Sequence, residues 1–259
     1  MKRSLLLILF AVLILNLSFP NLHAQSAKDL LQQADDKFDA LQYKSAIILY
    51  GDVLKKDPAN YRALWRTAHA YANRGVVLLG KDADDDVIEA LYLKGASFAK
   101  KAIKVKPDGA DGHALLSVCE GRLAMFAGGK RKVELSKNVQ KEALLAIKYD
   151  PKHDGALHVL GVWHREVATL GGMLKFFAKV LYGGLPDASL KEAIAYMKKS
   201  VAIAPDNLEH HLDLGKCYEE NDQEDLAMKE YKTVLSLPNK EAHDKDIKKE
   251  AKELIEDLE

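Results

Sequence analysis

The chain has 259 residues, and its 38 basic and 38 acidic side chains give a formal net charge of zero. This balance excludes a protein that is drawn to nucleic acid or to an anionic membrane by its net charge. The length suffices for one large domain or for a repeat array. The two cysteines, Cys119 and Cys217, fall in predicted helices of separate repeats. We expect two buried free thiols, and a disulfide in an oxidising compartment is the alternative.

The first 24 residues have the order of a secretory signal peptide. Two basic residues open the chain, the apolar run Leu5–Leu17 follows, and Ala24 supplies a small residue before a cut. A bilayer-spanning helix takes about 20 apolar residues, so this run is short for a permanent anchor. We expect cleavage after Ala24, with an uncleaved signal anchor as the alternative. The mature chain, residues 25–259, is then one periplasmic or secreted domain.

Beyond this segment the chain repeats a pattern of paired helices. Ala46 and Tyr50 stand at the same distances before Pro58 as Ala193 and Met197 stand before Pro205. A proline ends one helix because the residue before it disfavours the α conformation, and proline fits the first turn of the next helix. The prolines that end similar helices are Pro58, Pro107, Pro151, Pro205 and Pro238.

The helix that follows these prolines carries a small residue at a recurring place, such as Gly161 after Pro151 and Gly215 after Pro205. A small residue lets two antiparallel helices approach, and a large residue beyond it fills the gap. The pattern resembles the tetratricopeptide repeat. It predicts an all-α superhelix of about five helix pairs with a C-terminal capping helix.

Three units are longer than the others because residues are inserted between their two helices. The inserted segments are Gly75–Asp86, Gly121–Lys132 and Thr169–Asp187. Asp187 or Ser189 is the expected N-cap of the helix after the third segment. After the last proline, a polar helix at about residues 241–258 is expected to close the array. Its apolar stripe consists of Ile247, Ala251, Leu254 and Leu258.

The third insertion contains the stretch Met173–Tyr182, which is apolar on nearly every side and includes Phe176 and Phe177. Lys175 and Lys179 share one of its faces. One interpretation is a helix that binds a membrane surface or a partner. A second is a helix tucked into the concave side, because glycine pairs at both ends let it fold back. A third makes it one wall of a pocket for a small apolar ligand or lipid.

Longer stretches of the sequence resemble the regulator of microtubule dynamics family. These stretches are Leu64–Arg66, His113, His158–Trp163, Met173–Tyr182, Pro186–Ser189 and Leu214–Tyr218. The resemblance implies tetratricopeptide-like proteins without a catalytic apparatus, whose animal members are associated with microtubules and with mitochondrial or endoplasmic-reticulum membranes. The signal peptide is of bacterial type, so we expect a secreted bacterial member. A microtubule-associated or membrane-associated regulator is the alternative by family analogy.

In tetratricopeptide arrays the first helix of each pair lines the concave face, and the resemblance places a mixed set of side chains there. The expected partner-binding residues are Arg62, Trp65, His69, Asn73, Arg122, His158, Arg165, Glu166 and Lys216. Both signs of charge, two histidines and a tryptophan favour a groove for an extended peptide or a helix of a protein partner. A tryptophan is costly to expose without use. An ordinary solvated face of mixed charge is the alternative.

No motif for catalysis, a cofactor or a metal ion is found. The sequence lacks a GxSxG motif, a Walker loop, a dinucleotide fingerprint and HExxH. Asp82, Asp84 and Asp86 alternate as in a calcium loop, but Val87 and Leu93 stand where that loop needs glycine and glutamate. We expect an acidic loop that caps the next helix. The sequence therefore predicts a non-enzymatic scaffold or adaptor without cofactor or metal, which binds no nucleic acid.

Overall fold

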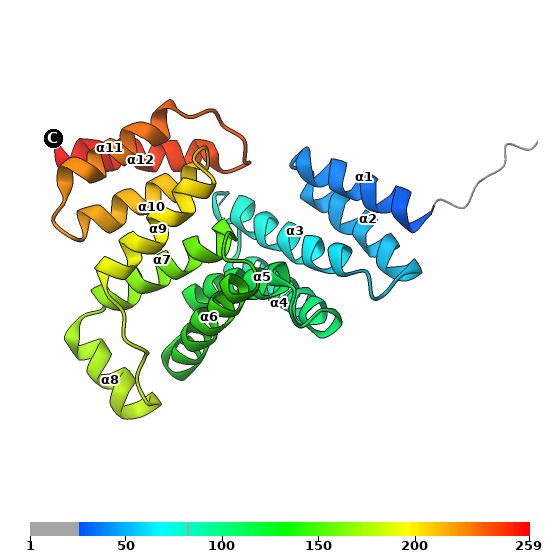
Figure 1. The fold of residues 1–259 in the computed structure, drawn as a ribbon, viewed down its shortest axis with the longest axis horizontal. Coiled ribbons are helices and arrows are strands. Elements are labelled where there is room, and N and C mark those ends of the chain that lie inside the picture. Colours follow the sequence, from blue (N-terminus) through cyan, green and yellow to red (C-terminus); the bar gives the residue numbers. More distant parts are fainter. Residues whose placement is uncertain (1–25, 82) are drawn as a thin grey trace, which may run out of the picture.

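The computed structural model describes residues 26–81 and 83–259, and their regular structure is entirely helical (Figure 1). The helices are α1 (Ala27–Asp39), α2 (Tyr43–Lys56), α3 (Tyr61–Leu79), α4 (Asp85–Val105), α5 (Ala110–Phe126), α6 (Gly129–Tyr149), α7 (Asp154–Thr169), α8 (Gly172–Tyr182), α9 (Leu190–Ile203), α10 (Leu208–Glu219), α11 (Glu224–Ser236) and α12 (Asp244–Leu258). The predicted all-α fold is confirmed for these ranges. The predicted signal peptide, residues 1–24, and Asp82 lie outside them.

Successive helices pack as pairs that follow one another in chain order. The pairs are α1 with α2, α3 with α4, α5 with α6, α7 with α9, and α10 with α11, and α12 packs on the last pair. Figure 1 shows the row curving from α1 to α12, with α8 projecting from it. The predicted superhelix of five pairs and a capping helix is confirmed.

The proline joints are closed by the capping bonds that the sequence pattern requires. After α2, the Asp57 N–H donates to the Val53 carbonyl at 2.8 Å. Asn60 then caps α3, because its side chain accepts a hydrogen bond from the Ala63 N–H at 3.0 Å. At the joint before α10, Asn207 does the same for the His210 N–H at 3.1 Å. Each joint thus satisfies backbone groups that a helix end leaves open.

Glycines on first helices set the close approach within the pairs. A Cβ built on Gly161 of α7 would lie 2.6 Å from Cγ of Met197 on α9, and one built on Gly215 of α10 would overlap the Tyr231 ring of α11. Met197 and Tyr231 are fully buried. The predicted complementarity of a small and a large residue is therefore present in both pairs.

The first two insertions lengthen the helices that flank them. The helices α3 and α4 have 19 and 21 residues, and α5 and α6 have 17 and 21, whereas α10 and α11 have 12 and 13. The apolar stretch after Gly75 continues α3 to Leu79, so the added length extends a packed face. Asp84 takes the N-cap position of α4, and Asp85 and Asp86 stand in its first turn. Their negative charges interact favourably with the positive end of the helix dipole there.

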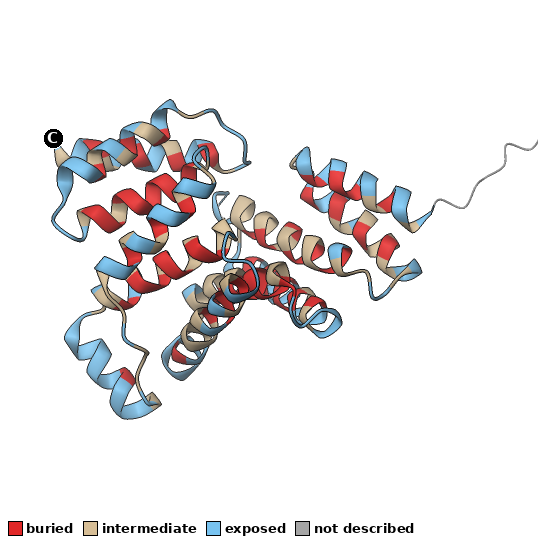
Figure 2. Cartoon of the chain, in the orientation of Figure 1, coloured by how far each residue is buried: buried red, intermediate tan, exposed pale blue. Residues whose placement is uncertain are grey.

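The third insertion forms α8, which is exposed on nearly all sides (Figure 2). Only Ala178 of this helix is buried. The interpretation of a helix tucked into the concave side is therefore wrong, because the other side chains of α8 meet no second layer. Surface depressions lie on α11 and between α4, α5 and α6, and α8 lines neither of them. The interpretation of α8 as one wall of a ligand pocket therefore has no support from these two depressions.

The ends of the neighbouring helices are close to the predicted ones. Ser189, not Asp187, caps α9, because its Oγ accepts a hydrogen bond from the Glu192 N–H at 3.2 Å. The capping helix α12 begins three residues later than predicted, at Asp244. Of its predicted stripe, Ile247 and Ala251 are buried and Leu254 and Leu258 are partly buried, while Ile255 is buried as well.

The core consists of buried clusters that follow the array. Cys119 lies in the cluster formed by α3 to α6, and Cys217 lies in the cluster formed by α9 to α12. Both thiols are free and buried, and burial raises the pKa of each to about 12. They are therefore protonated packing residues at neutral pH. In the part of the chain that the structure describes, no helix is both long and apolar enough to cross a membrane.

Candidate partner-binding site on the inner face

Asp213 of α10 is the centre of an ion-pair cluster with residues of α7. His158 Nε2 lies 2.8 Å from Asp213 Oδ2, and Arg165 Nη1 donates to Oδ1 at 3.1 Å. Only 8 % of Asp213 is exposed. An imidazole and a guanidinium thus share one carboxylate that has little contact with solvent.

Glu209, one turn before Asp213, bridges to a helix two pairs away. Arg122 Nη2 of α5 donates to Glu209 Oε1 at 2.9 Å. The helices α5 and α10 belong to the third and fifth pairs, so these side chains meet only because the first helices converge on the inner side of the curve. His243, just before α12, brings its Nε2 to 3.9 Å from Glu209 Oε2. This geometry identifies the inner face.

Lys216 and Glu166 complete the arrangement. Lys216 Nζ lies 3.8 Å from Asp213 Oδ1 and 2.6 Å from Glu250 Oε1 of α12. Arg165 also donates to Glu166, which is exposed at the rim. We call these two neighbouring sets of ion pairs, one centred on Asp213 and one on Glu209, the inner cluster. It consists of Arg122, His158, Arg165, Glu166, Glu209, Asp213, Lys216 and His243.

The pKa shifts of Asp213, His158 and Glu209 in the inner cluster all favour the charged form. Burial alone would raise the pKa of Asp213, but the hydrogen bond from His158 and the charge of Arg165 hold it well below its usual range. Burial alone would lower the pKa of His158, and the bond to Asp213 raises it instead. The pKa of Glu209 is lowered well below its ordinary value against burial, by His243 and Arg122. Each charge is retained by its partners.

Three members of the inner cluster are partly exposed. The thiol of Cys217, which lies nearby, is held protonated by burial. No group of three or more His, Cys, Asp or Glu side chains is placed to hold a metal ion within residues 26–81 and 83–259. The side chains of Arg122, Glu209 and Lys216 keep 30 %, 31 % and 25 % of their surface exposed. These three can therefore meet the charges of a partner.

The candidate residues of α3 form a separate group against α1. Arg62 Nη2 lies 2.9 Å from Asp35 Oδ2. The Arg66 guanidinium stacks over the Trp65 ring at 5.0 Å, and Trp65 also packs against the core of α3 to α5. Trp65 is only partly exposed. The cost of exposing a tryptophan therefore does not argue for a partner at Trp65, because the chain itself covers most of this ring.

The remaining two candidates of α3, His69 and Asn73, lie against the first helix pair, α1 and α2. His69 packs on the Phe38 ring with centroids 4.8 Å apart. Asn73 lies beside Tyr43, whose hydroxyl donates to Glu241 Oε2 at 3.0 Å. Because Tyr43 opens α2 and Glu241 precedes α12, the array touches itself here, 198 residues apart in sequence. The start of the last helix therefore bounds the inner face at this end.

The structure brings together five of the nine expected partner-binding residues: Arg122, His158, Arg165, Glu166 and Lys216. Asp213 and His243 were missed by sequence reasoning. A lone aspartate on a polar helix face is common, so its type alone carries no signal. The available signal was the spacing of Glu209, Asp213 and Lys216, which places three charges of both signs on one face of α10.

Histidines in the inner region predict a loss of stability in acid. Burial, and then the charge of Arg66, lowers the pKa of His69 to about 4. Unfolded histidine has a pKa of about 6.5, so below that pH the unfolded state binds the extra proton and the folded state is disfavoured. Between pH 7 and pH 5, we expect His69→Gln to lose about 1–2 kcal/mol less stability than the parent chain. Chemical denaturation at both pH values measures this difference.

His243 gives the control of opposite sign. Burial alone would lower its pKa, but Glu209 raises it above the ordinary value. Its stabilising contribution is present in acid and is lost as the pH rises through the folded-state pKa. His243→Gln should therefore lose more stability than the parent chain between pH 7 and pH 5. If neither substitution changes the stability that is lost between pH 7 and pH 5, these assignments are wrong.

The fold and the inner face define a class, the tetratricopeptide-type α-superhelix. The structure is similar to TTC0263, a thermophilic tetratricopeptide protein of Thermus thermophilus, with a TM-score of 0.64 and 16 % identity over 89 % of this chain and 99 % of that one. It is also similar to PilF of Pseudomonas aeruginosa, with a TM-score of 0.54 and 12 % identity over 90 % of this chain and 88 % of that one. At these identities the similarity concerns the fold.

The chain belongs to the regulator of microtubule dynamics family. The family model described as regulator of microtubule dynamics protein 1-3 matches residues 30–259. Regulator of microtubule dynamics protein 1 of Mus musculus is 25 % identical over 232 residues, which are 89 % of this chain and 74 % of the relative. Protein 2 of Mus musculus is 26 % identical over 252 residues, which are 94 % of this chain and 60 % of the relative. The predicted family resemblance is confirmed.

Proposed function

We propose that this chain is a non-enzymatic scaffold that binds a segment of another protein on its inner face. The observation that carries the proposal is the inner cluster. Removing charges from water is costly, and well-packed apolar side chains hold helices together at least as well. A cluster of charges drawn from α5, α7, α10 and the start of α12 is thus a poor device for stability alone. It is well suited to recognition, because its partly exposed members present fixed charges.

The exposed edge of the inner cluster indicates the chemistry of the partner. Arg122 and Lys216 present positive charge, and Glu209 presents negative charge between them. A segment with both acidic and basic side chains matches this edge, as an extended strand or as one helix. The concave surfaces of helical solenoids are commonly used in this way.

The family name and the predicted signal peptide bear on the cellular setting. The relatives are named as regulators of microtubule dynamics, and binding of a protein partner is what that role has in common with this proposal. We infer from the predicted signal peptide that this chain acts in the periplasm or after secretion. Its partner is therefore to be sought in extracts of those fractions.

Capture of the partner tests the proposal. We expect the immobilised domain, residues 25–259, to retain a defined protein from an extract of the organism that carries this chain, identified by mass spectrometry. Arg122→Gln combined with Lys216→Gln should reduce its recovery at least about tenfold, because a hydrogen bond to a charged group contributes about 1.5–3 kcal/mol. The thermal melt of the double variant, followed by circular dichroism, verifies that it is folded.

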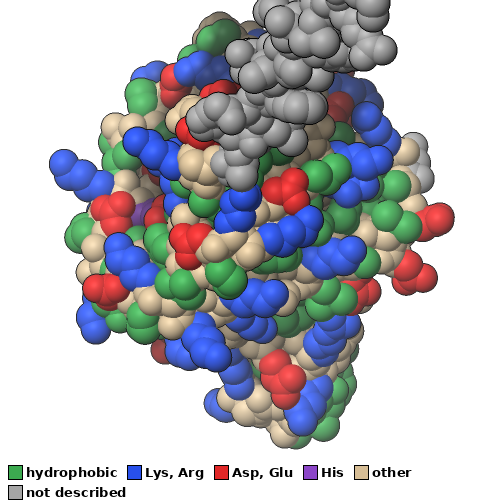
Figure 3. All heavy atoms as spheres, turned by 90° about the vertical axis from the view of Figure 1, so that its right-hand side faces the viewer, with side chains coloured by type: hydrophobic (Ala, Val, Ile, Leu, Met, Phe, Trp, Pro, Cys, Tyr) green, Lys and Arg blue, Asp and Glu red, His purple; other side chains and the backbone are tan. Residues whose placement is uncertain are grey.

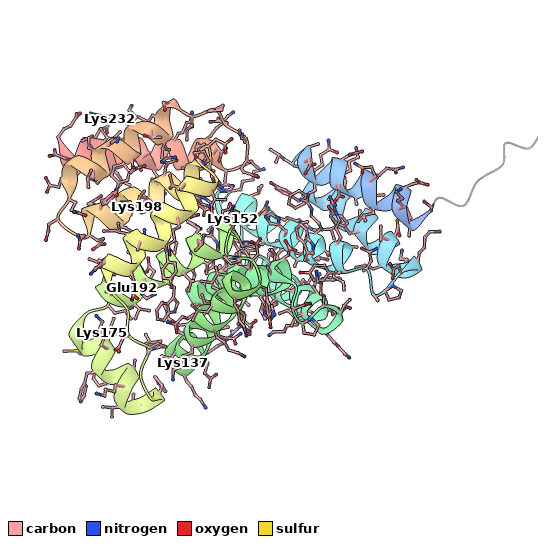
Figure 4. The ribbon with its side chains drawn as sticks, in the orientation of Figure 1. Lys137, Lys152, Lys175, Glu192, Lys198 and Lys232 are labelled. Atoms are coloured by element: carbon pink, nitrogen blue, oxygen red, sulfur yellow. The ribbon has the colours of Figure 1, made fainter. Side chains whose placement is uncertain are left out.

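Two outer lysines provide the matched control. Lys198 and Lys232 are exposed on α9 and α11, the second helices of their pairs (Figure 4). Lys198→Gln combined with Lys232→Gln removes the same number of positive charges and should leave recovery unchanged. If both double variants retain the partner equally, the binding surface is not the inner face and the proposal fails.

A further inference from the structure

The helix α8 presents an unpartnered apolar face to solvent. The six large side chains of this face are each between 48 % and 74 % exposed. They are Met173, Leu174, Phe176, Phe177, Val180 and Leu181. Scattered exposed apolar residues are ordinary, whereas so many on one short helix are the mark of an interaction site.

These side chains form one continuous arc. With about 100° per residue, the six positions cover about 160° of the helix circumference, from Phe176 round to Leu174. Ala178, the buried position, lies outside the arc. Lys179 stands about 60° beyond Phe176 and borders the apolar face on that side. Lys175 lies opposite the centre of the arc, and its Nζ donates to the Ala168 carbonyl at 2.8 Å. The helix is amphipathic with its apolar face turned away from the protein.

Contacts with α6 hold α8 in this orientation. The helix packs on α6, and Lys137 of α6 donates to the Tyr182 carbonyl at 3.1 Å. Gly183 ends the helix in the left-handed conformation at φ 75°, which glycine adopts without strain. Figure 1 shows α8 projecting from the row of pairs. One side is therefore held against α6 while the arc stays open.

The surroundings of the arc are basic. Residues 167–186 contain no acidic side chain. The start of α6, with its run Lys130–Lys132, lies beside the end of α8, because a Cβ built on Gly129 would be 3.3 Å from the Tyr182 hydroxyl. Lys130 and Arg131 of this run pair with Glu134 and Glu89, whereas Lys132 and Lys179 form no ion pair with any described residue. Figure 3 shows basic, hydrophobic and acidic side chains at the lower end of the molecule, where Figure 1 places α6 and α8.

We propose that α8 is an interfacial membrane-binding helix that inserts its apolar arc into a bilayer surface with anionic headgroups. Eleven residues make a helix about 16 Å long, which lies in the plane of the interface and cannot span a bilayer. Lys179, at the border of the arc, can extend to the headgroups while its stem lies on the apolar layer. Anionic lipid complements the positive surroundings of the arc.

A second copy of this chain is a poorer occupant of the same face. An antiparallel, two-fold pairing of the α8 arcs would bring the lysine border of each copy close to the border of the other. Like charges at such a seam oppose association. The anionic surface relieves this repulsion, and the second copy is therefore the competing outcome of the test.

Vesicle flotation tests the proposal with the domain of residues 25–259. We expect flotation with vesicles that contain phosphatidylcholine and phosphatidylglycerol, and at least about tenfold less with phosphatidylcholine alone. Added salt should reduce the bound fraction. Phe176→Ser combined with Phe177→Ser should abolish binding, because it interrupts the arc. Ile48→Ser, at a side chain of α2 that is 60 % exposed, is the matched control and should leave binding unchanged.

A second variant separates charge from apolar insertion. Lys132→Gln combined with Lys179→Gln should lower binding to the anionic vesicles several-fold and leave the weak binding to phosphatidylcholine unchanged. All four substituted side chains are exposed, so thermal melts should match that of the parent chain. Two results would each overturn the proposal: no flotation of the parent chain, or equal flotation of the Phe176→Ser/Phe177→Ser variant. If flotation is absent and ultracentrifugation shows a dimer that depends on the phenylalanines, the face is occupied by a second copy instead.

Discussion

Asp213→Ala is expected to lower the free energy of unfolding by about 3–5 kcal/mol at neutral pH. The substitution removes the carboxylate that pairs with His158 and Arg165, and it leaves the largely buried Arg165 guanidinium and His158 imidazole without it. Loss of one partner of a buried ion pair costs more than the pair contributed, because the other charge stays desolvated. Denaturant unfolding followed by circular dichroism measures the change.

Asp206→Ala is the matched control. Asp206 lies in the turn before α10, is exposed and pairs with the exposed Lys240. An ion pair between exposed side chains contributes little to stability, because water and salt screen it. The two aspartates stand seven residues apart in the sequence, so the comparison isolates the effect of burial. If both substitutions cost the same, the inner cluster does not carry the buried charges that the structure assigns to it.

The stability that Asp213→Ala loses depends on pH in a direction that the pKa of Asp213 determines. The pKa of Asp213 is held below the value of about 3.9 that aspartate has in an unfolded chain. Its stabilising contribution is therefore complete above that value and is lost as the pH falls toward the folded-state pKa. We expect the difference in the free energy of unfolding between the parent chain and Asp213→Ala to become smaller below about pH 4. A difference that widens in acid would contradict the assignment.

The sequence was sufficient to predict the array because its signals are local. A proline joint, an asparagine cap and a glycine opposite a large residue each act within about one helix pair, as at Pro205, Asn207 and Gly215. Repetition of such signals through the chain makes each one more specific. The same reasoning could not show that the first two insertions lengthen helices, because inserted length does not tell a loop from an extension of a helix.

The exposure of α8 and the centre of the inner cluster depended on tertiary structure. Apolar composition alone favours burial, and Phe176 and Phe177 become exposed only because α6 covers a single side of their helix. Likewise, Arg122 and Glu209 stand 87 residues apart, and their contact follows from the curvature of the whole array. The curvature accumulates from small rotations between pairs, which no single sequence position encodes.

Gly215→Ala is expected to destabilise the last pair by about 1–3 kcal/mol. The added methyl group would overlap the ring of Tyr231. This ring has no free space to enter, since Tyr231 is fully buried and its hydroxyl donates to Glu219 Oε2 at 2.6 Å. Relief requires either a shift of α11 away from α10 or loss of that hydrogen bond. The midpoint of chemical denaturation measures the loss.

Gly51→Ala supplies the control that makes the first result specific. Gly51 lies within α2, and a Cβ built on it meets nothing within 4 Å. Alanine is a better helix former than glycine by up to about 1 kcal/mol, so this substitution should stabilise the chain. The same chemical change is thus expected to have opposite signs at two helical positions. Stabilisation by both substitutions would contradict the close approach of α10 and α11.

A double variant locates the cause of the expected loss. Tyr231→Leu removes the ring that the new methyl group would meet, at the cost of a cavity and of the bond to Glu219. If the overlap causes the loss, Gly215→Ala combined with Tyr231→Leu should cost less than the two single substitutions added together. Strict additivity would place the cause within α10 itself. The sign of this coupling therefore tests whether a glycine opposite a large residue, the feature that recurs along the array, sets the distance between paired helices.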